Sequence, residues 1–219
     1  MRRLLALFAI AMSALGLAIA VNPAGAAAAH RVPATVKIVV RPVNAAGFAR
    51  PGFVVTGEPT GSVDCTLAVP SPGAVSPNIE SCFPSAEYAV ACWKAAAPHK
   101  VLCMRNPRVP ALVRIPRHGA FAPTALAPAR DRAPLGMELL NGNFCAIRDG
   151  GAGPTRAGHP KWVATYYCNN GKAIWMRPGA RHFGVFEAFP SWTVIVAGPT
   201  GPITAHHVAK AWFVGTFTG

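Results

Sequence analysis

Short apolar stretches separated by turn residues recur along the chain after residue 30. Gly, Pro, Asn or Ser bounds each stretch, as is typical of strands. No window in this part of the chain keeps a 3.6-residue apolar period long enough to predict a helix. The pattern predicts an all-β fold, either an antiparallel sandwich or a barrel-like meander. The expected strands are 36–40, 53–56, 63–67, 88–93, 100–105, 111–115, 137–140, 144–148, 162–168, 172–177, 192–197 and 208–216.

Asparagine and glycine mark two tight turns between these stretches. Asn141-Gly142 follows the stretch 137–140, and Asn169-Asn170-Gly171 lies between Tyr167 and Ala173. An Asn-Gly pair adopts the positive φ values that a type I′ hairpin needs. We therefore expect a type I′ hairpin at both places.

Two segments rich in Pro, Ser and Ala, 57–86 and 119–134, are predicted to be long loops over the core. The second could divide the chain into two subdomains. The absence of a long polar linker favours a single β domain over residues 30–219.

The first 29 residues have the layout of a cleaved secretory signal peptide. Arg2 and Arg3 precede the apolar run 4–21, and small residues fill 24–29. Eighteen apolar residues could nearly span a bilayer, so a retained anchor is the alternative. The polar break at 22–23 favours cleavage before His30. After cleavage no apolar run is long enough for a transmembrane segment, and we expect a secreted or envelope protein.

An even number of cysteines in an exported chain predicts disulfides. A hairpin of 88–93 with 100–105 would place Cys92 opposite Cys103, and antiparallel pairing of 144–148 with 162–168 would bring Cys145 near Cys168. Cys65 and Cys82 are then left for each other. The spacings contain no C-x-x-C pair, so no metal site is expected. The even count leaves no odd thiol, so no free catalytic cysteine is expected.

The exported part is strongly basic. Without Arg2 and Arg3, 19 Lys and Arg residues stand against 8 Asp and Glu residues, a formal charge of +11. Such a chain is attracted to anionic surfaces, here an anionic lipid, a wall polymer or a host surface. No nucleic-acid partner is expected, because no recognition motif accompanies the charge. A solvated basic face is the alternative to an anion-binding patch. The candidate anion-binding residues are Arg105, Arg108, Arg114, Arg117, Arg156 and His159.

The chain contains no common catalytic motif, such as G-x-S-x-G, H-E-x-x-H or G-x-x-x-x-G-K. We therefore predict a binding protein with no catalytic residue, cofactor or metal. Glu138 and Asp149 could form an acid/base pair, although structural ion pairs with neighbouring arginines are the simpler interpretation. His206 and His207 would point to opposite faces of a strand and could not chelate one ion together.

The glycine-rich loop 149–160 is the most ligand-like segment, because it carries Arg156 and His159. A glycine-rich crossover between two strands would have the same composition. Ser191, together with Asp149 near His159, supplies the residue types of a nucleophilic site. An extracellular hydrolase whose site is assembled from distant residues is therefore the alternative function.

Several motifs together resemble a group of uncharacterised small exported proteins of mycobacteria and related actinobacteria. They include Ser76-Pro77-Asn78-Ile79, Ala91-Cys92-Trp93, Val101-Leu102-Cys103, the run 145–151 and the run 208–216. The resemblance covers nearly the whole exported part. It implies a common fold and compartment, and it transfers no catalytic residue.

Overall fold

A computed structural model describes residues 31–57, 61–83, 89–148, 153–188 and 190–218. Residues 32–219 form one compact unit. The predicted signal peptide lies outside the described residues. Within the described part of the chain, no helix has the length and apolar character needed to cross a bilayer.

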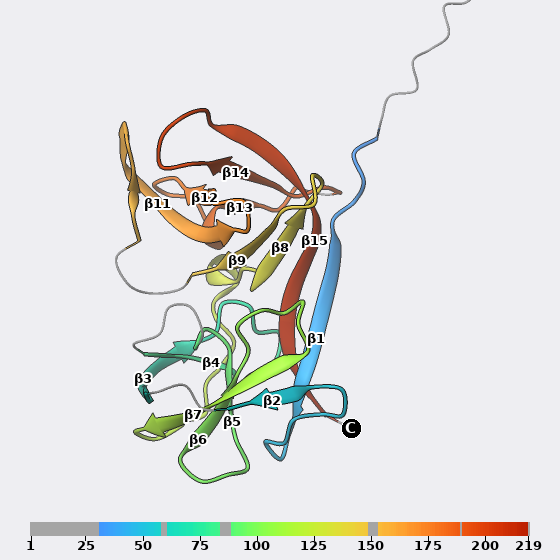
Figure 1. Cartoon of the computed structure of the whole chain (residues 1–219), viewed down its shortest axis with the longest axis vertical. Coiled ribbons are helices and arrows are strands. Elements are labelled where there is room, and N and C mark those ends of the chain that lie inside the picture. Colours follow the sequence, from blue (N-terminus) through green and yellow to red (C-terminus); the bar gives the residue numbers. More distant parts are fainter. Residues whose placement is uncertain (1–30, 58–60, 84–88, 149–152, 189, 219) are drawn as a thin grey trace, which may run out of the picture. The chain divides into compact units, whose positions relative to one another are not determined.

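The larger of two sheets contains nine strands of the described chain (Figure 1). Strand β15 pairs with β1, β8 and β14, so that β15, β8, β9, β11, β12 and β14 close on themselves like a barrel. Closure removes exposed strand edges. The strands are β1 (Val36–Asn44), β8 (Gly136–Leu139), β9 (Phe144–Ile147), β10 (Thr155–Arg156), β11 (His159–Cys168), β12 (Ala173–Met176), β13 (Val185–Phe186), β14 (Thr193–Ala197) and β15 (Thr204–Phe217).

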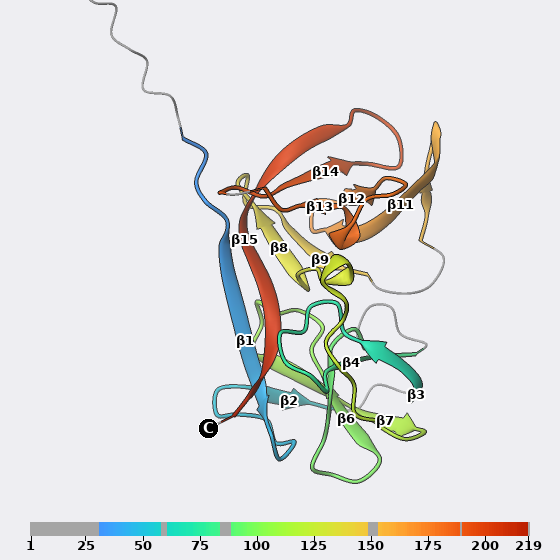
Figure 2. The ribbon, with the colours of Figure 1, turned by 180° about the vertical axis from the view of Figure 1, so that it is seen from behind.

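The smaller sheet closes in a similar way, because β7 pairs with both β3 and β6 and the order between them is β3-β4-β5-β6. Strand β2 extends it beside β7. Figure 2 shows β1 and β15 running side by side past both sheets. The strands are β2 (Val54–Thr56), β3 (Val63–Pro70), β4 (Glu80–Phe83), β5 (Cys92–Lys94), β6 (Lys100–Cys103) and β7 (Ala111–His118), and two short 3₁₀ turns, η1 (Ala129–Asp131) and η2 (His182–Gly184), lie outside the sheets.

The all-β, barrel-like class is confirmed, with two differences in detail. Three ladders are parallel, namely β1 with β15, β2 with β7 and β3 with β7. An antiparallel meander does not include them, because they join strands that are distant in the sequence. The segment 57–86 was expected to be a loop apart from the strand 63–67, but β3 continues to Pro70 and the segment also contains β4. Strand β4 has the sequence Glu-Ser-Cys-Phe, which shows no apolar alternation.

The three predicted disulfides are confirmed. Cys92 faces Cys103 across the β5–β6 ladder, with their Cα atoms 4.1 Å apart. Cys145 faces Cys168 across the β9–β11 ladder at 3.9 Å. The remaining pair, Cys65 and Cys82, joins β3 to β4. Three disulfides indicate an oxidising, extracellular compartment.

Both predicted hairpins form, but their turns are not type I′. Only Gly142 and Gly171 have positive φ, 81° and 75°, whereas type I′ also needs a positive φ at the preceding Asn. The Gly142 amide donates to the Leu139 carbonyl, and the Gly171 amide donates to the Cys168 carbonyl. This is a three-residue loop that ends in a left-handed glycine, the second common solution for a hairpin.

One cluster of buried side chains extends across both sheets. It includes Leu102 and Leu112 from the smaller sheet and Met137, Tyr166 and Ile174 from the larger one. The segment 119–135 carries the chain from the smaller sheet into the larger one. A second cluster fills the smaller sheet around two of the disulfides. The shared core holds strands of both sheets against one another, and the cavities form where their surfaces meet.

Candidate functional site

A cavity of about 580 Å³ lies between the two sheets. Strands β2 and β7 and the turn after β6 line one side, and β9 and β11 line the other. Its polar lining residues are Thr56, Arg105, Asn106, Arg148 and Tyr167. Its apolar lining residues are Val109, Ala111, Val113, Ala146 and Ile147. We call this cavity the basic cleft. Its size is in the range of small-molecule sites.

Arg148 lies where β9 ends, and its backbone amide donates to the Thr165 carbonyl at 2.8 Å. Its Nη1 donates to the Tyr167 hydroxyl at 3.1 Å, and its guanidinium lies 5.5 Å from the centre of that ring. The Nε of Arg148 is buried and has no acceptor in the described part of the chain. The guanidinium is therefore held in place by Tyr167 and still has donors for an incoming anion.

The lining of the basic cleft, as far as the structure describes it, contains two arginines and no Asp or Glu. Asp149 follows Arg148 in the sequence and lies outside the described residues. Arginine recognises carboxylate and phosphate groups through paired N–H donors. A low-dielectric apolar floor strengthens that attraction relative to water. The cleft therefore suits an anionic group attached to an apolar body.

The structure does not gather all the candidate anion-binding residues into one patch. Arg105 lines the basic cleft. Arg108 instead forms an ion pair with Glu138, at 3.8 Å, and lies over the Phe144 ring at 5.0 Å. Arg114 is exposed on β7.

Arg117 lies near the C-terminal end of β7, and its side chain donates to the Gly119 carbonyl. Its charge lowers the pKa of the buried Glu80 and so opposes the effect of burial. Arg117 does not line the basic cleft, and its charge acts on a carboxyl group of the smaller sheet.

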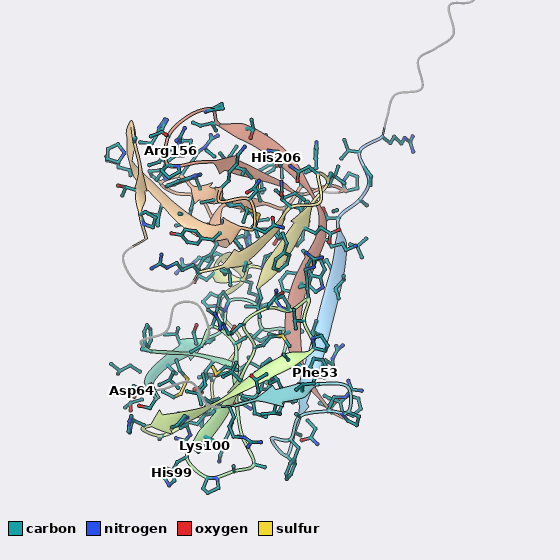
Figure 3. The ribbon with its side chains drawn as sticks, in the orientation of Figure 1. Phe53, Asp64, His99, Lys100, Arg156 and His206 are labelled. Atoms are coloured by element: carbon teal, nitrogen blue, oxygen red, sulfur yellow. A yellow bond between two sulfur atoms is a disulfide. The ribbon has the colours of Figure 1, made fainter. Side chains whose placement is uncertain are left out.

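Arg156 and His159 lie in the larger sheet, and neither lines the basic cleft. Arg156 is only 5% exposed, and its Nη1 donates to the carbonyls of Gly198 and Pro199 at 3.0 and 3.2 Å. A further bond joins its Nη2 to the Gly201 carbonyl. Figure 3 shows Arg156 in the larger sheet, where it belongs to β10. His159 stacks on Trp162 with ring centres 4.3 Å apart. Arg156 thus holds the 198–201 turn.

The residues considered for acid/base or nucleophilic chemistry are dispersed. Glu138 accepts from Lys210 at 3.1 Å in addition to its contact with Arg108. Ser191 Oγ lies 3.2 Å from His207 Nδ1, but no carboxylate contacts His207 in the described part of the chain. His206 contacts Asn141 and Thr204 instead. The two histidines have separate partners, as their strand positions imply.

Glu80 is a buried carboxyl group that the sequence analysis did not single out. It is fully buried, and both carboxylate oxygens lack a hydrogen-bond partner in the described residues. Burial raises the pKa of Glu80 to about 7, although the Arg117 charge opposes the shift. Its carboxylate lies within 4.8 Å of the sulfurs of Cys65 and Cys82. These sulfurs are bonded to each other and do not offer thiolate ligands.

The sequence pattern did not point to Arg148 and Tyr167 as a pair that lines a cavity. The signal that could have found them is the predicted pairing of Cys145 with Cys168. That register places Tyr167 opposite Ala146, on the same side of β9 as Arg148 two positions along. The approach of β2 and β7 to this face was not predictable from the local pattern.

Comparison of the chain with models of protein families, with curated proteins and with solved structures finds no match. The resemblance to exported actinobacterial proteins therefore stays a prediction.

Proposed function

We propose that the chain is an exported binding protein without catalytic activity, and that it binds an anionic lipid of the cell envelope. The basic cleft would hold the charged headgroup against Arg105 and Arg148. The apolar lining from β7 and β9 would contact the adjoining hydrocarbon. The observation that carries the proposal is the pairing of two arginines with an apolar floor in a cavity whose described lining contains no carboxylate.

Export of the chain is part of this proposal. The three disulfides support an oxidising compartment. The sequence layout of residues 1–29 supports a cleaved signal peptide. The motifs that resemble exported actinobacterial proteins point to the same compartment and to a cell-envelope setting.

The positive formal charge of the chain would bring the protein to an anionic lipid surface. A long-range positive field attracts the protein to an anionic bilayer, and salt screens that attraction. The field by itself selects no headgroup. Specific recognition would come from Arg148, whose orientation is fixed by Tyr167.

The test is binding of the purified, oxidised protein to vesicles of phosphatidylglycerol and of phosphatidylcholine at two salt concentrations. Loss of one charge-assisted hydrogen bond costs about 1.5–3 kcal/mol, so Arg148→Gln should weaken binding to the anionic vesicles by about 10-fold or more. Arg114→Gln removes the same charge from an exposed site on β7 and is the matched control, with an expected loss of less than about 3-fold.

Two results would refute the proposal. Equal, salt-independent affinity for both kinds of vesicle would remove its electrostatic basis. Equal losses of vesicle affinity in Arg148→Gln and Arg114→Gln would show that the protein binds the membrane through its overall charge and not through the basic cleft. Preferential binding to a soluble anionic wall polymer would replace the lipid with the polymer as ligand.

A further inference from the structure

A second cavity, of about 490 Å³, lies where the ends of β1 and β15 approach β5. The turn at 76–78 and the segment 121–123 complete its wall. None of its lining residues is shared with the basic cleft as the structure describes both. We call it the amide cavity, because Asn44 and Asn78 both line it.

The polar side chains of the amide cavity are oriented by backbone groups. Asn44 Oδ1 accepts from the Phe48 amide at 3.0 Å, and Asn78 Oδ1 accepts from the Thr124 amide at 3.1 Å. Ser76 Oγ likewise accepts from the Thr216 amide at 3.2 Å. These bonds occupy acceptors. The Nδ2 groups of both asparagines and the hydroxyl hydrogen of Ser76 are left as donors, with no partner in the described part of the chain.

Trp93 adds a buried donor to the same wall. Its side chain is only 3% exposed, and its Nε1 has no acceptor among the described residues. A buried N–H without an acceptor is unfavourable, so this indole is under-satisfied in the structure. Lys94 follows Trp93, is exposed, and also lines the cavity.

The turn that presents Asn78 has an unusual backbone conformation. Asn78 has φ = 60°, a left-handed value that asparagine tolerates better than most residues other than glycine. Such conformations are concentrated at ligand sites, where the surrounding structure enforces them. The turn belongs to the Ser76-Pro77-Asn78-Ile79 motif that the sequence analysis singled out and that the basic cleft does not use.

From this lining we infer that the amide cavity binds a saccharide, with preference for a sugar unit that carries a carboxylate. Several neutral side chains that carry donors line one space, and sugar hydroxyl and ring oxygens are suitable acceptors. The rings of Phe121, Pro77 and Pro123 offer apolar surface for the C–H face of a sugar. Lys94 accounts for the acidic preference, because the described lining contains no carboxylate to oppose it.

This site goes beyond the proposed function, since it uses a different cavity and a different class of ligand. A phosphate headgroup fits it less well than a sugar, because the donors are neutral apart from Lys94. The basic cleft has the opposite character, with two arginines and an apolar floor. The two cavities can therefore be tested separately.

The experiment is calorimetric titration of the oxidised protein with an oligosaccharide of uronic acid and with its carboxyl-reduced, neutral counterpart. We expect saturable binding of both, tighter for the acidic one. Asn78→Gly keeps a residue that tolerates φ = 60° and removes the amide. It should weaken both ligands by about 10-fold. Lys94→Gln is an exposed change, and it should weaken the acidic ligand several-fold and leave the neutral one unchanged.

Asn170→Gly is the matched control. The Oδ1 of Asn170 likewise accepts a backbone amide, that of Lys172 at 3.1 Å, and Asn170 lines neither cavity. This control should bind both oligosaccharides as the parent protein does. Absence of saturation by either ligand at millimolar concentration would overturn the inference. So would sugar binding that survives Asn78→Gly and Lys94→Gln but is lost in Arg148→Gln, because the ligand would then occupy the basic cleft.

Discussion

Because Glu80 is buried, we predict that the folded state loses stability as the pH rises. Burial raises the pKa of this carboxyl from 4.5 to about 7, and the nearby Arg117 charge only partly offsets it. In the folded state Glu80 holds its proton between these pH values, whereas in the unfolded chain it releases it. The folded state is therefore favoured at low pH, and this contribution is lost as the pH rises through about 7.

The size of the effect follows from the two pKa values. They differ by about 2.5, and each pKa unit corresponds to about 1.4 kcal/mol. The free energy of unfolding should therefore fall by about 3 kcal/mol between pH 4.5 and pH 8 on account of Glu80 alone. That is a large part of the 5–15 kcal/mol typical of folded proteins. His206 acts in the opposite direction, because burial lowers its pKa, so the wild-type curve contains both terms.

The assay is urea denaturation of the oxidised protein at constant ionic strength, across this pH range, for the wild type and for Glu80→Gln. The difference between the two curves isolates Glu80, and it should shift by about 3 kcal/mol in favour of the glutamine variant as the pH rises. Glu187→Gln makes the same chemical change at an exposed position and should show no such pH-dependent difference. Parallel curves for wild type and Glu80→Gln would show that the pKa of Glu80 does not differ between the folded and the unfolded state.

Three further variants test the structural interpretation. Tyr166→Phe removes a buried hydroxyl that donates to the Pro134 carbonyl at 2.8 Å, and denaturant titration should show a loss of about 1–2 kcal/mol; no change would mean that this bond is absent. Cys145→Ser combined with Cys168→Ser opens a disulfide of sequence separation 23 and should cost about 3 kcal/mol, measured in the same way; an unchanged unfolding midpoint would contradict the cross-link. Arg156→Gln removes a buried charge that three carbonyl groups accept, and it should lower the free energy of unfolding by about 2 kcal/mol. Vesicle binding should stay unchanged. A specific loss of vesicle binding would instead assign Arg156 to the ligand site.

Much of the fold was predictable, because strands, turns and disulfides have local signatures. Cys92 and Cys103 flank a short connection, so that a hairpin and its cross-strand bond could be inferred together. Strand β4 was missed because its pairing with β3 and the burial of Glu80 come from tertiary contacts and not from its own sequence pattern. The parallel ladder of β1 with β15 was missed for the same reason, since it joins residues more than 170 positions apart.

The candidate site was less predictable than the fold. Charge counting named Arg105 and Arg156 alike, but the structure places Arg105 in the lining of the basic cleft and turns the Arg156 donors to carbonyl groups of the turn at 198–201. The number of charges along a chain does not show which of them lie at a cavity. Arg148 became a candidate only when β9 and β11 were seen to face β2 and β7.

Binding of an anionic lipid in the basic cleft is tested most directly by an NMR titration of the ¹⁵N-labelled, oxidised protein with a soluble short-chain phosphatidylglycerol below its micelle concentration. We expect saturable shifts concentrated at the basic cleft, in the Arg105 and Arg148 side chains and in the amides of Ala146 and Tyr167. Small, non-saturating shifts spread over exposed basic residues such as Arg114, with none larger at the cleft, would contradict it.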